Sequence, residues 1–121
     1  MQKYTPSHEW ILMNQNEGTV GITRYAQGEL GEIVYVEVPL IGKEFCMGQE
    51  SAVLESTKAA ADVYVPVTGV VTAVNEALVL NPSLLNKDPE GAGWIFKIHV
   101  QDLKQLDDLL EEKEYIAMIQ A

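Results

Sequence analysis

Short runs of apolar and β-branched residues, separated by turns rich in glycine, proline and asparagine, dominate the hydrophobic pattern of the chain. The clearest pair flanks the polar segment 55–60, with residues 49–54 before it and residues 61–67 after it. Such runs predict strands, and two strands with a polar connection predict a hairpin. Because a hairpin turn keeps its backbone groups in water, we expect Lys58 to be exposed at the tip.

Further strands are predicted as similar runs along the rest of the chain. They cover residues 8–13, 19–23, 32–38, 70–74 and 94–100. In the run 32–38 the side chains alternate between two faces, so Val34, Val36 and Val38 are expected to face the core together. The same alternation puts His99 on the exposed side of the last strand and four residues on the other side: Trp94, Phe96, Ile98 and Val100.

Two short internal helices are predicted at the edges of this β-structure. Thr23 is a suitable N-cap for the first, and Gly28 or Gly31 a suitable C-terminal stop, because glycine adopts the left-handed conformation freely. Asn81 is the expected cap of the second, with Pro82 in its first position.

The C-terminal residues carry apolar side chains at helical spacing, which predicts helices over residues 102–110 and 111–119. The side chains expected to pack inward are Leu103, Leu106, Leu109, Leu110, Tyr115, Ile116 and Ile119. The complete pattern predicts one domain over residues 1–121 that is mainly β. We expect a flattened barrel or sandwich of two small antiparallel sheets, with the lysine hairpin protruding at one end and short peripheral helices.

Composition and charge narrow the possible function. A formal net charge of −10 and a pI near 4.4 argue against nucleic acid and against an anionic membrane surface, which both need basic patches. They fit electrostatic steering to basic surfaces on partner proteins, although ordinary solubility explains the charge equally well. No apolar run approaches the roughly 20 residues of a spanning helix, and residues 1–4 show no targeting pattern. We therefore expect a cytoplasmic protein. We also expect a monomer, although the sequence does not determine the oligomeric state.

Catalytic and metal-binding side chains are scarce. Cys46 is the only cysteine, so an internal disulfide is impossible, and His8 and His99 are the only histidines. A nucleophilic cysteine needs a base beside it, and a zinc site needs several cysteine or histidine ligands. The sequence therefore predicts neither an enzyme nor a metal site.

Lys58 is the residue that suggests a chemical role. Its neighbours Thr57 and Ala59 are small and leave room for an approaching active site. A lysine presented in this way is suited to covalent attachment of a swinging cofactor arm by a modifying enzyme. For an arbitrary chain, a solubilising turn lysine is the commoner interpretation, so the choice depends on the other motifs.

Five blocks in order along almost the whole chain resemble the glycine cleavage H-protein family, whose members are lipoyl carriers with a biotinyl/lipoyl-attachment fold. They are Ser-His-Glu-Trp at 7–10, residues 20–34, the hairpin 55–69, residues 74–82, and Gly-Trp-Ile-Phe-Lys-Ile at 93–98. One block alone is a weak signal, whereas five in this order are specific to the family.

The resemblance implies that Lys58 carries lipoate through an amide bond. In this family the arm accepts the aminomethyl group that a pyridoxal-phosphate glycine decarboxylase leaves after removing CO₂ from glycine. An aminomethyltransferase then passes the methylene to tetrahydrofolate and releases ammonia, and dihydrolipoamide dehydrogenase reoxidises the dithiol. The carrier is not itself an enzyme, and its remaining partner is the lipoyl-attaching enzyme.

The resemblance also implies a cleft for the loaded arm, lined by Ser7, Glu9 and Asp62. A carboxylate and a hydroxyl are suitable partners for a protonated amine. Without the resemblance, Glu9 and Asp62 are equally consistent with two surface carboxylates. The chain departs from the family at three positions near the arm, where Thr57, Ala61 and Val65 replace the common valine or serine; these changes put partner recognition in question more than the modification itself.

Alternatives to a glycine cleavage carrier stay open at this level. A carrier of the same fold could relay lipoate to other enzymes without glycine cleavage, and the sequence does not separate the two roles. A biotin carrier fits less well, because Thr57 and Ala59 stand where that family typically has methionine. A small independent enzyme lacks a catalytic constellation, and a purely structural domain would leave Lys58 unmodified.

Overall fold

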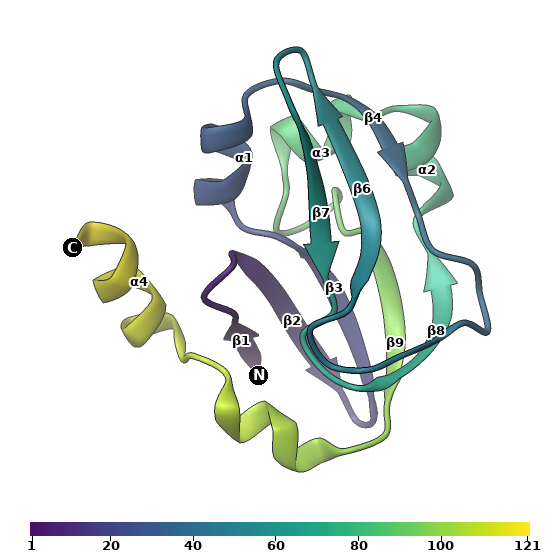
Figure 1. Cartoon of the computed structure of the whole chain (residues 1–121), viewed down its shortest axis with the longest axis vertical. Helices are drawn as coiled ribbons and strands as arrows, with labels where there is room; N and C mark the ends of the chain where they lie inside the picture. Colours follow the sequence, from purple (N-terminus) through teal and green to yellow (C-terminus); the bar gives the residue numbers. More distant parts are fainter.

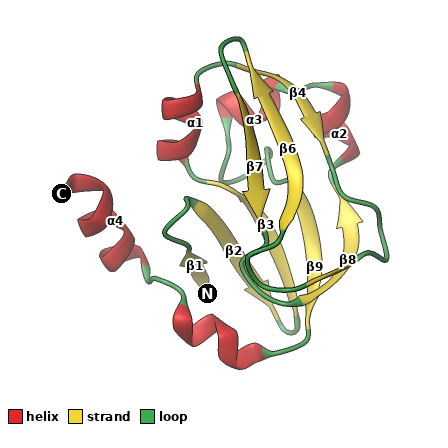
Figure 2. Cartoon of the chain, viewed as in Figure 1, coloured by secondary structure: helices red, strands yellow, loops and turns green.

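The computed structural model describes residues 1–121 and consists of two antiparallel sheets with short helices around them (Figures 1 and 2). The larger sheet has six strands in the order β1-β2-β3-β9-β8-β5 and the smaller has three in the order β4-β6-β7. The expected mainly β architecture of two antiparallel sheets is therefore confirmed. The strands are β1 (Gln2–Tyr4), β2 (Glu9–Asn14), β3 (Glu17–Ile22), β4 (Ile33–Glu37), β5 (Glu44–Phe45), β6 (Glu50–Ser56), β7 (Ala60–Tyr64), β8 (Gly69–Val74) and β9 (Phe96–Val100).

The helices lie at the periphery of the sheets (Figure 2). They are α1 (Arg24–Leu30), α2 (Glu76–Leu80), α3 (Ser83–Lys87), a 3₁₀ helix (Leu103–Asp108) and α4 (Glu112–Gln120). The side chain of Thr23 caps α1 by accepting from the Ala26 amide, as expected, and Gly31 ends the helix with φ at 84°. None of these helices has the length and apolarity required to cross a membrane.

One apolar core joins the two sheets. It contains Ile11, Val20 and Ile22 from the larger sheet and Ile33, Val36 and Leu54 from the smaller one, all buried. Burying both inner faces in one core accounts for the alternation of apolar and polar residues along these strands. Phe96, Ile98 and Val100 of β9 belong to this core and His99 is exposed, as the alternation predicts, whereas Trp94 is only half-buried.

A second, smaller cluster lies where α4 packs beside β1. Tyr4, Trp10 and Tyr115 are its buried members, and Trp94, Leu110, Met118 and Ile119 pack against them. Figure 1 shows α4 on the same side of the molecule as α1. The C-terminal helix is therefore attached to the N-terminal strands.

The alternation predicted for residues 32–38 is wrong at Val34, which is 52% exposed. The pairing of β4 with β6 shifts register between Ile33 and Tyr35, so β4 carries a bulge there. A bulge adds one residue to a strand and reverses the facing of the side chains beyond it. Ile33 and Val36 are consequently both buried, although they are three residues apart.

Three predictions for the helical segments are also corrected. Asn81 does not cap α3 with its side chain but accepts a hydrogen bond from the Ser83 hydroxyl, and it follows the unpredicted helix α2. Leu103 is 49% exposed, because the segment 103–108 is a 3₁₀ helix and its first residue projects beyond the core. Ile116 is 39% exposed, since α4 turns Tyr115 toward the protein instead.

Candidate functional site

The β6–β7 hairpin forms one end of the long axis of the molecule, and Lys58 lies at its tip (Figure 1). Its strands extend to Ser56 and start again at Ala60, so the turn is tighter than the predicted segment 55–60. Ser56 closes the turn: its hydroxyl oxygen accepts from the amides of Lys58 and Ala59 at 3.2 and 3.0 Å. The Lys58 side chain is exposed, as expected.

The Lys58 side chain lies over the end of helix α1. A Cβ atom added to Gly31 would stand 3.4 Å from Cε of Lys58 and 3.9 Å from Nζ. Gly31 also has φ at 84°, a conformation that favours glycine. Because Gly31 has no side chain, a path from the hairpin tip to the end of α1 stays open beside Lys58.

A cavity of about 180 Å³ opens beside this path. Its apolar wall combines residues from strands of both sheets with one side of α1: Ile22, Ala26, Leu30, Leu54, Ala61 and Val63. Its polar lining consists of Ser7, His8, Glu9, Glu29 and Asp62. We call this cavity the cleft. Ser7, Glu9 and Asp62, which the sequence placed together only through a resemblance, line the same cleft.

Glu9 is the buried acid of the cleft, with 2% of its surface exposed. Its Oε1 accepts hydrogen bonds from the hydroxyls of Ser7 at 2.6 Å and Thr5 at 2.5 Å. Its Oε2 accepts from the backbone amide of Tyr64 at 3.3 Å. No cation of the chain pairs with it, since the only ion pair joins Lys3 to Glu111 at 3.4 Å. The interpretation of Glu9 as a surface carboxylate is therefore wrong, whereas Asp62 is exposed.

Burial is the main influence on the Glu9 carboxyl and raises its pKa above the ordinary value of 4.5, while the hydrogen bonds from Ser7, Thr5 and the Tyr64 backbone oppose the rise. The folded chain thus keeps this proton at pH values where the unfolded chain has released it. A carboxylate that is partly desolvated and has no cation beside it favours the binding of a positively charged ligand.

A Glu9→Gln variant should separate the contribution of Glu9 to the pH dependence of stability from the contributions of the other acids. As pH rises from 4.5 through the raised pKa, the parent should lose free energy of unfolding relative to the variant, because its folded state binds more protons over that range. Urea unfolding of both proteins at a series of pH values measures the difference. A difference that is constant with pH, or that changes in the opposite direction, would contradict the burial of an ionisable Glu9.

Sequence reasoning missed several residues of the cleft. Thr5 supplies a hydroxyl to Glu9, and His8 and Glu29 line the cavity wall. The chain order Thr5, Ser7, Glu9 offered a signal, since hydroxyls two and four residues before an acid can reach it in a tight turn. For Glu29 only the helical register of α1, with Ala26 and Leu30, indicates which side it faces.

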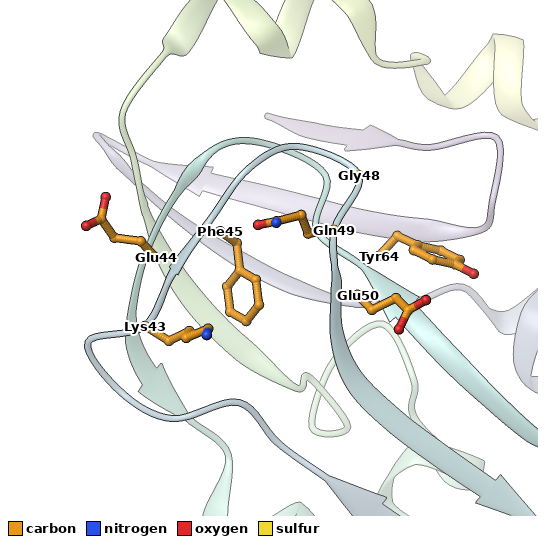
Figure 3. Close-up of a pocket in the computed structure, with 7 residues that line it drawn as sticks. All are labelled: Lys43, Glu44, Phe45, Gly48, Gln49, Glu50 and Tyr64. Atoms are coloured by element: carbon orange, nitrogen blue, oxygen red, sulfur yellow. The ribbon is translucent and has the colours of Figure 1, made fainter.

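The other cavities are poorer candidates for covalent-arm chemistry. One of about 440 Å³ lies at the base of the hairpin (Figure 3). Glu50 begins β6 and Tyr64 ends β7 there, at the ends of both strands away from Lys58. The lining of this open hollow is mostly polar and consists of Lys43, Glu44, Phe45, Gly48, Gln49, Glu50 and Tyr64. Figure 3 shows the Tyr64 ring pointing away from Lys43 and Phe45.

Cysteine and histidine, the residue types considered for catalysis or metal binding, do not come together in a site. Cys46 is exposed and its amide donates to Gln49 Oε1 at 2.7 Å. No group of three or more histidine, cysteine or acidic side chains has the geometry to hold a metal ion. Ala61 and Val65, two of the positions where the sequence departs from its resemblance, are a half-buried cleft residue and a buried core residue respectively.

Comparisons with known proteins give matches over almost the whole chain. The family model described as glycine cleavage H-protein matches residues 2–121. A glycine cleavage system H protein of Thermotoga maritima is 50% identical over 115 residues, which cover 95% of this chain and 93% of that one. A probable glycine cleavage system H protein of Sulfolobus acidocaldarius is 49% identical over 116 residues, covering 96% and 84%. The crystal structure of a glycine cleavage system H protein from Mycobacterium marinum superposes with a TM-score of 0.90 at 32% identity, covering 99% and 97% of the two chains.

Proposed function

The chain belongs to the glycine cleavage H-protein family, and from this premise we propose that it is a non-catalytic lipoyl carrier of the glycine cleavage system. Lys58 is the attachment residue, and the cleft of Ser7, Glu9 and Asp62 receives the loaded end of the arm. The observation that carries the proposal is the placement of an exposed hairpin lysine beside a cleft with an unpaired buried acid.

The residues present fit a lipoyl group. Its hydrocarbon chain is apolar and suits the wall of Ala26, Leu30 and Leu54, and the exposed lysine with small neighbours suits a modifying enzyme. When bound, lipoate supplies a disulfide that takes up the aminomethyl group of decarboxylated glycine and is later reoxidised from the dithiol. All other contributions of the chain are those of position, shielding and charge.

The cleft is suited to a primary amine as the cargo of the arm. An amine of this kind is protonated near neutral pH and would supply the cation that Glu9 lacks inside the chain. Opposite charges attract more strongly in a partly desolvated site than in water. Ser7 and Thr5 hold the Glu9 carboxylate in place, and Asp62 adds a second negative charge at the rim.

The partners follow from the same role. We propose that glycine decarboxylase loads the arm, that an aminomethyltransferase unloads it, and that dihydrolipoamide dehydrogenase reoxidises it. The test is to incubate the lipoylated chain with glycine and a glycine decarboxylase and to follow CO₂ release together with the intact mass of the chain. CO₂ release with a mass increase on the Lys58 peptide supports the role.

A second role, relay of lipoate to other enzymes, rests on the same attachment residue. It predicts lipoylation of Lys58 without glycine-dependent loading. Transfer of the lipoyl group from this chain to an acceptor domain, in the presence of a lipoyl transferase, measures it directly. The cleft favours the glycine cleavage role, because a relay of lipoate has no need of an acidic site for an amine.

Removing both carboxylates should shorten the lifetime of the loaded arm. The Glu9→Ala, Asp62→Ala double variant is expected to accept lipoate normally at Lys58 and to release ammonia and formaldehyde faster than the parent, because the amine is no longer held out of water. Release is followed over time after the decarboxylase is removed.

A matched control for that experiment replaces two acids outside the cleft in one double variant. Glu37→Ala and Glu44→Ala change the net charge by the same amount and leave the cleft intact. If the cleft variant releases ammonia no faster than this control, the two carboxylates do not guard the cargo and are merely part of the negative charge of the surface.

A further inference from the structure

The C-terminal helix reaches the cleft through Tyr115: its ring meets the His8 ring edge-on with centroids 5.7 Å apart, and its hydroxyl oxygen makes the polar contacts. This oxygen lies 2.8 Å from Nδ1 of His8 and 2.7 Å from the hydroxyl of Thr23. His8 lines the cleft, and Thr23 caps α1, the helix that contributes Ala26 to the cleft wall. The Tyr115 hydroxyl therefore stands between the two segments that form this side of the cleft.

His8 has a backbone conformation that needs support. Its φ is 76°, in the left-handed region that residues with a side chain adopt rarely and at a cost. The segment around it is tightly bonded: the His8 amide donates to the Thr5 carbonyl at 3.1 Å and the Thr5 amide donates to the Glu9 carbonyl at 2.9 Å. This turn directs the Ser7 hydroxyl onto the Glu9 carboxylate.

The turn is also joined to the start of α1. The Thr23 amide donates to the His8 carbonyl at 3.0 Å, so the backbone link and the link through Tyr115 connect the same two residues. A residue held at both its carbonyl and its ring has little freedom to leave the left-handed conformation. Loss of the Tyr115 hydroxyl would remove the hydrogen bond on the ring and leave the backbone bonds of His8 and the ring contacts with Tyr25 and Tyr115 to oppose the strain.

The Tyr115 ring is itself fixed. It is 4% exposed and stacks on Tyr4 with ring centroids 4.8 Å apart and planes 10° apart. Glu111 and Glu114 form a capping box at the start of α4, and the backbones of Tyr4 and Leu110 pair in both directions at 2.8 Å. The hydroxyl is thus presented by a rigid element.

We propose that Tyr115 is a positioning residue for the cleft: its hydroxyl holds His8 in the left-handed conformation and so keeps Ser7 and Glu9 aimed at the cargo of the arm. The part of this inference that concerns cargo rests on the proposed carrier function. The part that concerns the shape of the turn does not, and it is measurable on the chain without lipoate.

The first test is amide hydrogen exchange on the unlipoylated chain. Tyr115→Phe keeps the ring and its stack on Tyr4 and removes only the oxygen. Exchange of the His8 and Thr23 amides should accelerate about fivefold to tenfold, the factor that corresponds to the net loss of one hydrogen bond. Amides in the β6–β7 hairpin should be unchanged.

Ile119→Ala is the matched control, since it removes an apolar contact from the same helix without touching the hydroxyl. Equal acceleration in both variants would show that docking of α4, not the oxygen, supports the turn, and would overturn the proposal. Unchanged exchange at His8 and Thr23 in Tyr115→Phe would overturn it as well.

The second test follows release of ammonia and formaldehyde from the loaded, lipoylated chain. Tyr115→Phe should accelerate release several-fold and leave the extent of lipoylation unchanged. In a His8→Gly background the same change should have less than about a twofold effect, because glycine adopts the left-handed conformation without support and has no ring to hold. Equal effects in the two backgrounds would contradict an action through His8.

The two tests distinguish failure of the carrier role from failure of the positioning role of Tyr115. If the parent chain cannot be loaded from glycine, the carrier role fails, and the exchange measurement still decides the role of Tyr115. If loading succeeds and exchange accelerates but release does not, the hydroxyl shapes the turn without protecting the cargo, and the positioning role is refuted.

Discussion

A Lys58→Arg variant is expected to fold like the parent chain and to carry no lipoyl group at all. Lipoylation forms an amide on a neutral primary amine, whereas the arginine guanidinium stays protonated and is not an amine nucleophile. Lys58 is exposed at the tip of the hairpin, so the substitution should change the free energy of unfolding by no more than about 0.5 kcal/mol. Peptide mass spectrometry of both proteins, after treatment with a lipoyl-attaching enzyme, measures the loss.

Lys113→Arg is the matched control, because Lys113 is an exposed lysine on α4, away from the hairpin. This control should be lipoylated to the same extent as the parent, and only on the peptide that contains Lys58. Finding lipoyl on another lysine of the Lys58→Arg chain would show that the hairpin does not define the attachment site.

Phe96→Ala is expected to be the most destabilising of the substitutions considered. Phe96 is fully buried in β9, where it pairs with Val20 of β3 and Val74 of β8 at the centre of the larger sheet. Removing the ring leaves a cavity in the core that joins both sheets, with a loss of about 3–5 kcal/mol. Urea unfolding gives the free energy directly, and Phe96→Leu, which should lose less, keeps the comparison measurable if the alanine variant does not fold.

Val34→Ala is the control for this prediction and also tests the bulge in β4. The Val34 side chain is 52% exposed, so its truncation should change the free energy of unfolding by no more than about 0.5 kcal/mol. A loss as large as that of a buried residue would mean that residues 32–38 alternate without a bulge, with Val34 in the core.

The sequence by itself determined the features that depend on local pattern. Alternating apolar residues predicted the strands of the hairpin and the buried face of β9, and the short polar segment between two strands left Lys58 no place except an exposed tip. Thr23 marked the start of α1, because capping depends on a single residue in its local backbone. The sequence left the end open between Gly28 and Gly31, and the structure ends the helix at Gly31. The ordered motifs were enough to indicate the family that the comparisons show.

Only the tertiary structure decided the features that depend on pairing between distant segments. The bulge in β4 arises from its register with β6, which no alternation within residues 32–38 encodes. As a result Ile33 is buried and Val34 is exposed, the reverse of the prediction. The 3₁₀ segment that exposes Leu103 is likewise decided by how the chain crosses from β9 to α4.

The cleft shows the same division most clearly. The sequence supplied the acids, but the burial of Glu9 results from Thr5, Ser7 and the Tyr64 backbone closing around it from two elements. Tyr115 and His8 are more than a hundred residues apart, with a sequence separation of 107, and come into contact only because α4 packs beside β1. Desolvation and long-range hydrogen bonds are set by the packed molecule, because neither has a counterpart in the order of residues along one strand or helix.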